Sequence, residues 1–466
     1  MVFWEFNINA FDIIVLTGIL AAVFLLSNVI RRKVGFIRRS LLPTAVIGGI
    51  LMLMIKSFGL FDKIMNIQDA NLFMEAITYH TLGLGVVALT LKSSTKETNK
   101  QRQREIMDSG LITVNTYLIQ AIVGVAITVL FAVTIKTNLF PASGFILPLG
   151  FGQGSGQALT FGRIFQDDYG FAGGASFGLT VAAIGFLVAC LVGVLFIKII
   201  KKKGQILVAN EKPEFVSNEI IASPNEVPVT ESVDRMTMQV SLILLVYFIT
   251  FLFMYGIEKM PLGKFGTNTV KPMIWGFNFL IGSLFGVLLK QLFKLFKQTN
   301  LMTRVYSNNY LLNRISGFMF DLMIIAGISA IEINVLKSLI LPLIIITLAG
   351  TMVTFFYVRY LSYYLFPKYR NEAFLSLFGM LTGTMSTGMI LLREVDPKFE
   401  TPAANNLVFQ SFYAIAFGFP LFLLLGYAPK GLTETLISLG VVVVMFVIFN
   451  IILLRNKIFK KKCMNK

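Results

Sequence analysis

The chain has 466 residues, of which 56% are hydrophobic and only 14% are charged, a composition typical of a polytopic membrane protein. The formal net charge of +17 would indicate nucleic-acid binding in a soluble protein. Here the basic residues cluster in short loops beside apolar segments, as the positive-inside rule describes. We therefore expect a lipid bilayer around the chain and no nucleic-acid partner. The two cysteines, Cys190 and Cys463, give no disulfide framework.

Five apolar segments of the first half are long enough to cross a membrane, and clusters of Lys and Arg mark their cytosolic ends. The segments are residues 11–30, 41–60, 72–91, 111–133 and 171–200. Glu5 and Asp12 precede or begin the first segment and a basic cluster follows it, which is the reverse of a cleavable signal peptide. We expect the N-terminus to lie outside the cell.

Residues 143–166 differ from these spans because four glycines stand at alternate positions, at 150, 152, 154 and 156. Each Gly costs a helix interior about 1 kcal/mol relative to Ala, and a spacing of two does not place all four on one helical face. An unwound tip between two half-helices of roughly eight to ten residues explains the glycines better, and each leg would cross about half of the ~30 Å hydrocarbon core. A re-entrant hairpin also keeps every basic loop cytosolic. The alternative is an ordinary span with small residues for packing.

The second half repeats this order in the opposite orientation. Its predicted spans are 239–257, 273–289, 311–331, 339–358 and 407–425, with a second re-entrant hairpin at 372–394. Two interrupted apolar segments at corresponding places in two halves are typical of secondary transporters built from inverted repeats. The expected fold is an all-α polytopic membrane protein. It has two inverted-topology repeats of five transmembrane helices plus one re-entrant hairpin each, and an extra C-terminal transmembrane helix at 436–454.

The predicted division of the chain follows from these segments. It comprises a first repeat at 1–203, a polar cytosolic linker at 204–236, a second repeat at 237–428, and the extra span with a basic cytosolic tail at 429–466.

Three stretches resemble the bacterial sodium/glutamate symporter family. Residues 80–85, His-Thr-Leu-Gly-Leu-Gly, are similar to that family's Thr-x-Gly-Leu stretch. Residues 152–157, Gly-Gln-Gly-Ser-Gly-Gln, followed by Tyr169-Gly170-Phe171, are similar to its Gly-His-Gly-Thr-Gly tip and Tyr-Gly-Phe exit, with Gln153 in place of the His. The Gly- and Thr-rich second hairpin matches more loosely.

The resemblance implies a function as well as a fold. It implies a sodium-coupled symporter of a small carboxylate such as glutamate in the bacterial inner membrane. Sodium would be the coupling ion, and no other cofactor and no enzymatic activity are expected. By analogy with elevator-type carriers, a homodimer is expected in which a transport domain moves against a scaffold. An exporter or exchanger of another organic anion or amino acid, possibly proton-coupled, remains the alternative.

Helix N-termini at two broken hairpins would suit a carboxylate, because they carry about half a positive charge and unpaired N–H groups. The predicted substrate-binding residues are those of the two tips: Gly152, Gln153, Gly154, Ser155, Gly156, Thr382, Gly383, Thr384, Ser386 and Thr387. For any one hydroxyl, a hydrogen bond to a helical carbonyl is an equally good interpretation.

Several polar residues outside the tips could serve the coupling ion, because ionisable groups inside a membrane are functional candidates by default. These are His80, Thr81, Asp321, Asn405 and Asn406. A neutral His80 bonded to a neighbouring helix is the alternative, and Glu75 is a further carboxylate at this depth. Arg163 and Arg393 lie about nine residues past their tips, roughly 13 Å along a helix, so we expect them to be anchored by Asp167 and Asp396 instead of binding substrate.

Overall fold

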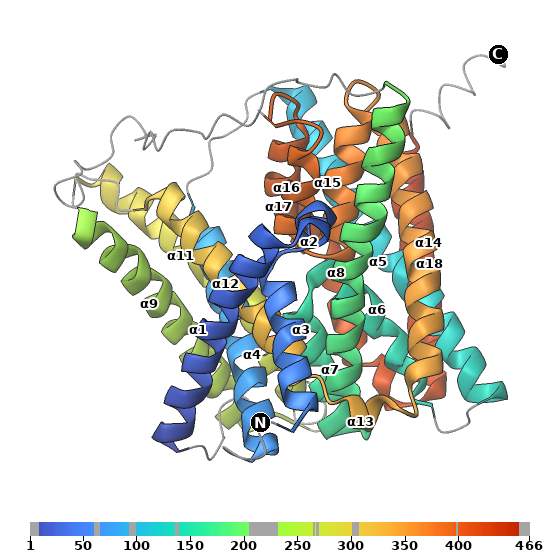
Figure 1. Ribbon diagram of the computed structural model, residues 1–466. Helices are drawn as coiled ribbons and strands as arrows, with labels where there is room; N and C mark the ends of the chain where they lie inside the picture. Colours follow the sequence, from blue (N-terminus) through green and yellow to red (C-terminus); the bar gives the residue numbers. More distant parts are fainter. Residues whose placement is uncertain are drawn as a thin grey trace. The chain divides into compact units, whose positions relative to one another are not determined.

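The computed structural model describes residues 9–59, 66–92, 99–135, 139–204, 232–263, 266, 270–300, 307–397 and 399–455 (Figure 1). Every element of secondary structure within these ranges is a helix. Nearly all of the predicted linker 204–236 lies outside the described residues, as do residues 456–466 of the basic tail with Cys463.

Ten helices in the described ranges are long and apolar enough to cross a membrane. They are α1 (Ala10–Lys33), α4 (Ile67–Leu91), α5 (Lys100–Thr134), α8 (Gly174–Lys202), α9 (Ser232–Lys259), α11 (Asn278–Gln298), α12 (Asn309–Ala330), α14 (Ile340–Leu365), α17 (Ala403–Leu425) and α18 (Leu432–Leu453). Ten of the eleven predicted spans correspond to one of these helices. The second predicted span, 41–60, corresponds to α3 (Thr44–Ser57), which has 14 residues. Its length of about 21 Å is short of a ~30 Å hydrocarbon core.

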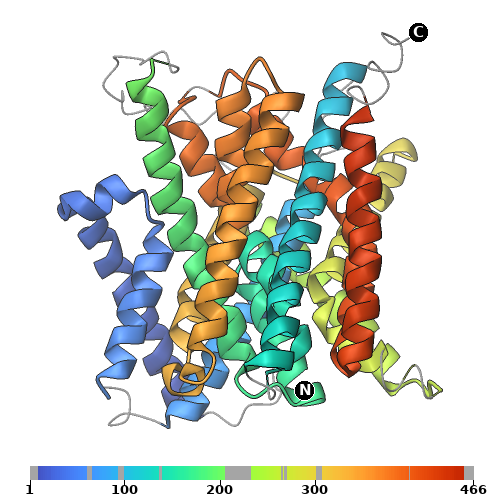
Figure 2. The same cartoon turned by 90° about the vertical axis from the view of Figure 1, so that its right-hand side faces the viewer.

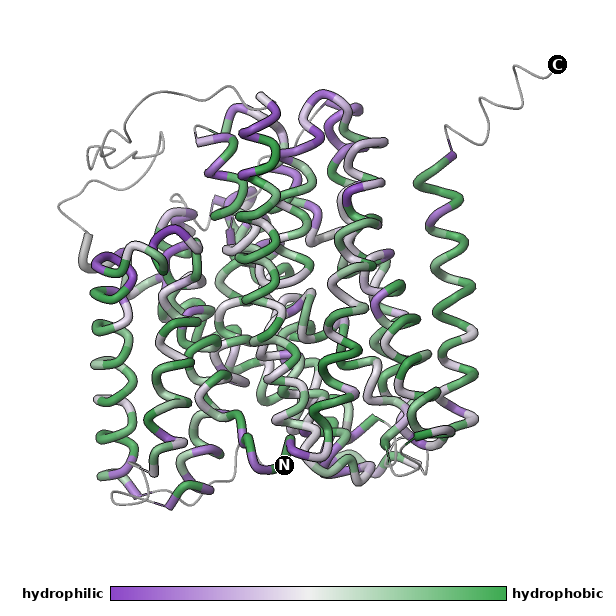
Figure 3. Tube along the Cα trace, turned by 45° about the vertical axis from the view of Figure 1, so that its right-hand side comes forward, coloured by the Kyte–Doolittle hydropathy of each residue, from purple (hydrophilic) through white to green (hydrophobic). Residues whose placement is uncertain are grey.

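Hydrophilic residues gather toward the ends of the helices, and hydrophobic residues make up most of the stretches between those ends (Figure 3). Helix α18 illustrates this pattern, because large hydrophobic side chains such as Val444 and Ile448 are exposed along it. Exposed apolar surface on this scale needs an apolar surrounding, which the lipid bilayer provides.

The order of the helices occurs twice along the chain. Four long or apolar helices, α1, α3, α4 and α5, are followed by a broken pair, α6 (Ile146–Gln153) and α7 (Ser155–Tyr169), and then by α8. In the second half α9, α11, α12 and α14 are followed by α15 (Arg370–Thr382), α16 (Met385–Arg393) and α17. The division into two repeats and their inverted orientation in a membrane stay predictions.

The chain forms two compact units, and both predicted repeats contribute to each. The first unit contains Met1–Tyr79, Glu97–Leu195 and Leu322–Lys466, and the second contains His80–Lys96 and Phe196–Asp321.

Helix α5 is the centre of the first unit. It packs against α14, α17, α18, α6 and the 3-10 helix η1 (Pro141–Phe145). The packing against η1 is close because both sides are glycine there: a Cβ on Gly124 would collide with the backbone of Gly144. In Figures 1 and 2 the α6–α7 pair begins at the end of this unit where α5 ends, and the α15–α16 pair begins at the opposite end. The two broken pairs therefore point toward each other.

The second unit is built around α9, with α10 (Lys271–Gly276) and α11 packed against it. A buried apolar cluster joins α9 to the end of α4 and the start of α12; its members are Val87, Ala88, Leu91, Ile243, Val246, Leu312 and Ile315. Two glycines of residues 80–85, the stretch that resembles the symporter family, also pack in this unit. Gly83 lies against the Tyr247 ring and Gly85 against the Phe320 ring.

Candidate functional site

The first broken pair is a hairpin with its break at one glycine. Helix α6 ends at Gln153, α7 begins at Ser155, and Gly154 between them has φ +80° and ψ −171°. Residues with a side chain rarely adopt a positive φ, so the break requires glycine at position 154. The Tyr117 hydroxyl of α5 donates a hydrogen bond of 3.1 Å to the carbonyl of Gly152 in the last turn of α6.

The second broken pair has its break at Gly383 and Thr384, and Thr384 is extended. Its two legs cross closely, because a Cβ on Gly379 would lie only 2.8 Å from the Cα of Gly388. The legs of the hairpins are less equal than predicted: α6 and α16 have 8 and 9 residues, whereas α7 and α15 have 15 and 13.

The two tips meet inside the first unit. A Cβ on Gly154 would lie 3.4 Å from Cγ2 of Thr384, and α6 packs against α15. Helix α8 lies beside both hairpins through a row of glycines. A Cβ on Gly178 would meet the Ala158 carbonyl of α7, one on Gly185 would lie 2.5 Å from the Thr382 carbonyl, and one on Gly193 would lie 2.6 Å from the Leu391 side chain. These glycines therefore let α8 pack closely against both hairpins.

Two helix N-termini, which carry partial positive charge, and two helix C-termini, which carry partial negative charge, meet at the tips. The first intrahelical donors after the breaks are the amides of Ala158 and Gly388, which bond to the carbonyls of Gly154 and Thr384. The N–H groups of residues 155–157 and 385–387 therefore have no intrahelical acceptor, and these helix starts favour an anion. The ends of α6 and α15 present carbonyls that lack intrahelical donors to the same region, and these helix ends favour a cation. The arrangement can hold a carboxylate and a small cation side by side.

The family model for the sodium/glutamate symporter matches residues 7–401. The chain belongs to the sodium/glutamate symporter family. This family suggests sodium-coupled glutamate transport, and it is a family of transporters instead of enzymes. A search of curated proteins finds no match to the chain.

The ten predicted substrate-binding residues of this symporter-family chain lie at the two tips that meet. Gln153 and Thr384 are half-buried and Ser386 is exposed, whereas the other seven residues are buried. The Ser155 hydroxyl donates to the carbonyl of Met323 (3.2 Å), and the Thr382 hydroxyl donates to its own helix at Phe378 (2.8 Å). Gln153 and Ser386 form no side-chain hydrogen bond within the described part of the chain, so their polar atoms are available to a substrate.

Two glutamines at the tips were not predicted from the sequence. Gln157 lies two residues into α7 and is 1% exposed, yet neither of its amide atoms has a partner among the described residues. Gln120 of α5 is fully buried and reaches the end of α15. A signal existed in both cases: Gln157 closes the Gly-Gln-Gly-Ser-Gly-Gln motif, and Gln120 is an amide within an otherwise apolar span.

The predicted ion-coupling residues of the symporter lie in separate places. His80, Thr81 and Asp321 belong to the second unit, where His80 Nδ1 lies 2.8 Å from the Tyr247 hydroxyl. That contact fits the alternative of a His bonded to a neighbouring helix. Asn406 belongs to the first unit and lies where the second hairpin begins. Its side chain donates to the Tyr369 hydroxyl (2.9 Å) and accepts from Arg102 (3.1 Å). The neighbouring Asn405 is exposed.

Arg163 and Arg393 have different partners. Arg163 lies 3.8 Å from Asp167, as predicted, but its main partner is Glu75, with Nε donating to the carboxylate at 3.0 Å. The expected pair of Arg393 and Asp396 is wrong for the described residues. Asp396 accepts hydrogen bonds from the backbone of Glu400 and from Thr401, which cap the loop after α16, whereas Arg393 lies over the Phe399 ring.

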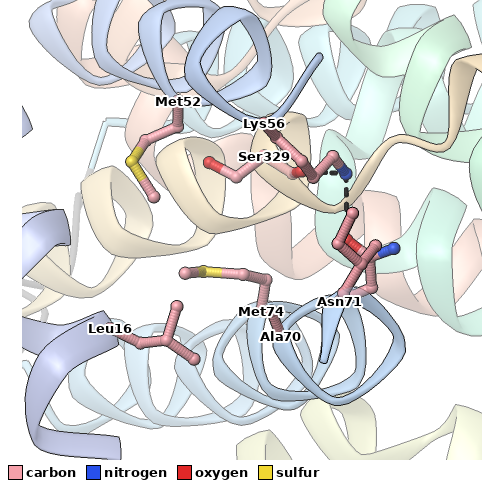
Figure 4. A pocket seen from close by; sticks show the side chains of 8 residues that line it. Leu16, Met52, Lys56, Ala70, Asn71, Met74 and Ser329 are labelled. Atoms are coloured by element: carbon pink, nitrogen blue, oxygen red, sulfur yellow. Dashed lines mark hydrogen bonds between the residues drawn. The ribbon is translucent and has the colours of Figure 1, made fainter. Parts of the chain in front are cut away.

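A small cavity beside α3 contains a lysine that is surrounded by oxygen atoms (Figure 4). The ammonium of Lys56 donates to Asn71 Oδ1 (2.9 Å) and to the carbonyls of Ser329 (2.6 Å) and Ile331 (2.8 Å). These carbonyls lie at the C-terminal end of α12, where a positive charge is favoured. Two glycines before it on α3, Gly48 and Gly49, let the helix approach Ile325 and Ile328 of α12.

Proposed function

We propose that the protein is a sodium-coupled symporter of a small carboxylate such as glutamate, and that the two hairpin tips form the binding site. The observation that carries this proposal is the meeting of two broken hairpins at Gly154 and Thr384, in a chain that belongs to the sodium/glutamate symporter family. The site would lie near the middle of the membrane, where carriers with broken helices bind their substrates.

The starts of α7 and α16 are proposed to hold the carboxylate groups of the substrate. Their unpaired N–H groups supply donors, and Gln153 and Ser386 add side-chain donors at the accessible side of the tips. Glycine at 152, 154 and 156 allows the substrate to approach the backbone.

Transport is proposed to follow an elevator-type alternating-access mechanism. The hairpins would move with the third to fifth and eighth to tenth spans, while the first two and the sixth and seventh spans would stay with a homodimer scaffold. The glycines of α3 support this proposal, because Gly48 and Gly49 face α12, a span of the moving part, and a smooth helix face can slide with few side-chain obstructions. We place the protein in the bacterial cell membrane with its N-terminus outside and its C-terminus in the cytosol.

Flux measurements test the proposed function. Purified protein in liposomes should accumulate labelled glutamate when sodium is high outside and low inside, and should not accumulate it in choline. Two outcomes would favour the alternative of an exporter or exchanger over the sodium symporter. One is uptake driven equally well by a proton gradient, and the other is exchange that needs no sodium. Competition by a panel of amino and carboxylic acids would then define the substrate.

A further inference from the structure

One turn of α5 contacts both hairpins. Tyr117 donates to the carbonyl of Gly152 at the end of α6, and Gln120, three residues later, donates to the carbonyl of Leu381 at the end of α15 (3.0 Å). The same amide nitrogen of Gln120 lies 2.8 Å from the hydroxyl oxygen of Thr354 on α14. Gln120 is thus held at the second tip from two sides.

These contacts fix which end of the Gln120 amide faces the hairpin. A backbone carbonyl can only accept a hydrogen bond, so the atom next to Leu381 must be the donor nitrogen. Oε1 is then the end of the amide that faces away from that carbonyl. Gln120 is fully buried, and no donor lies within hydrogen-bonding distance of Oε1 in the described part of the chain. Buried acceptors are nearly always paired, so a bound group outside the chain is the expected partner.

The end of α15, against which the Gln120 amide lies, favours a cation. Leu381 lies in the last turn of α15, and the last four carbonyls of a helix, here those of residues 379–382, have no intrahelical donor. Such a helix end carries partial negative charge. Amide and carbonyl oxygens are hard ligands, the type that alkali and alkaline-earth cations prefer.

We propose that Oε1 of Gln120 is a ligand of a sodium ion bound at the C-terminal end of α15, together with carbonyls of that helix. The inference rests on the proposed function, in which sodium is the coupling ion, and it places an ion beside Thr382, Gly383 and Thr384. Sodium at this position would hold the second tip in the conformation that meets the first, and it would thereby link ion binding to substrate binding without direct contact.

Sodium binding itself is the first test, and it needs no substrate. The unfolding temperature of the purified wild-type protein is measured in sodium chloride and in choline chloride at equal ionic strength. Gln120→Met keeps the length and approximate volume of the side chain but removes both polar atoms. We expect the concentration of sodium that gives half of the stabilisation to rise at least tenfold in Gln120→Met.

Thr116→Val is the matched control, because Thr116 is also buried on α5 and bonds only to the Ile112 carbonyl of its own helix. Its half-maximal sodium concentration should stay within twofold of wild type. Wild-type response to sodium in Gln120→Met would overturn the sodium site while leaving the symporter proposal intact. Sodium stabilisation without sodium-driven uptake would overturn the symporter proposal instead. A wild-type protein that sodium does not stabilise would contradict both.

A second variant keeps the inference testable if Gln120→Met does not fold. Gln120→Glu retains an oxygen ligand and adds a group that binds protons in competition with sodium. The half-maximal sodium concentration of this variant should therefore rise as the pH falls from 8 to 6, more steeply than in wild type. Parallel pH dependence in the two proteins would show that no cation contacts this position.

Discussion

Gly154 is the residue on which the first tip depends, since its φ of +80° is a conformation that residues with a side chain rarely adopt. Gly170 offers a matched control, because it has φ +75° but no atom within 4 Å of an added Cβ. Gly170→Ala should lower stability by about 1–2 kcal/mol, because Gly170 is in the left-handed helical region. Gly154→Ala should lower it by about 1–3 kcal/mol, because φ +80° with ψ −171° is a region that is almost restricted to glycine. Gly154→Val should also abolish uptake, whereas Gly170→Val should transport in proportion to its folded amount. Normal uptake by Gly154→Val would mean that the tip is ordinary helix.

Glu75 and Arg163 form a buried ion pair, with Glu75 only 2% exposed. Removing one charge leaves the other buried without a partner, so Glu75→Gln should destabilise the protein by about 3–5 kcal/mol. The double variant Glu75→Gln with Arg163→Gln should recover part of this loss. Asp167→Asn is the control, because Asp167 is 35% exposed and lies 3.8 Å away, and its change should be below about 1 kcal/mol. Thermal unfolding in detergent measures these three variants and the single variant Arg163→Gln; additive losses in the double variant would contradict direct coupling.

Among the elements, α8 is the helix that the hairpins touch through glycine. Gly185 faces the Thr382 carbonyl and Phe151 together, so Gly185→Val should push the two tips apart and lower uptake at least tenfold. A Cβ added at Gly18 of α1 would have no atom within 4 Å, so Gly18→Val should transport normally. Uptake is normalised to the amount of monodisperse protein. Equal uptake by the two variants would show that the fit of α8 against the tips has no role in transport.

The glycine spacing was sufficient to predict where both hairpins break, because glycine departs from helical preference by a known amount. The lengths of the hairpin legs were harder to predict. Helix α7 continues to Tyr169 through polar residues, so the end of the apolar segment does not mark the end of the helix. Helix α3 was overestimated because apolar residues continue on both sides of it, beyond Pro43 and Ser57. Glu75 and Arg163 are 88 residues apart, and no local pattern in one sequence indicates such a pairing. Gln120 and Gln157 are noticed because buried atoms of their amides lack hydrogen-bond partners among the described residues, and the sequence does not reveal this either.

For the whole molecule, the direction of insertion is testable without a structure. The positive-inside rule predicts that the linker 204–236 and the loop containing Ser307 are cytosolic, because only this orientation keeps the basic clusters inside. Single cysteines at Ser217 or Ser307, in a background without Cys190 and Cys463, should resist an impermeant maleimide added to intact cells. They should react after permeabilisation. Labelling of either site in intact cells would contradict the topology and the re-entrant hairpins together.

Movement of the hairpins is the other property of the whole molecule that can be measured. Ser155 is fully buried in the structure, with its hydroxyl bonded to Met323, so Ser155→Cys should react slowly in this state. Alternating access predicts that Ser155 becomes exposed to external water in one state and Thr384 to internal water in the other. Reaction rates of Ser155→Cys should therefore change when sodium and substrate are added. A rate that stays constant in a transport-competent variant would exclude a moving hairpin.

Lys56 adds a consequence for the pace of such movement. Its ammonium is a cation that belongs to the chain, held by Asn71 and by two carbonyls at the end of α12. Sliding of α3 along α12 would have to break these hydrogen bonds together, because one atom donates all three. Bonds that break and re-form in each cycle raise the barrier without changing which substrate is preferred. Lys56 would therefore set the lifetime of each conformation, whereas the residues of the two tips would determine which substrate is bound.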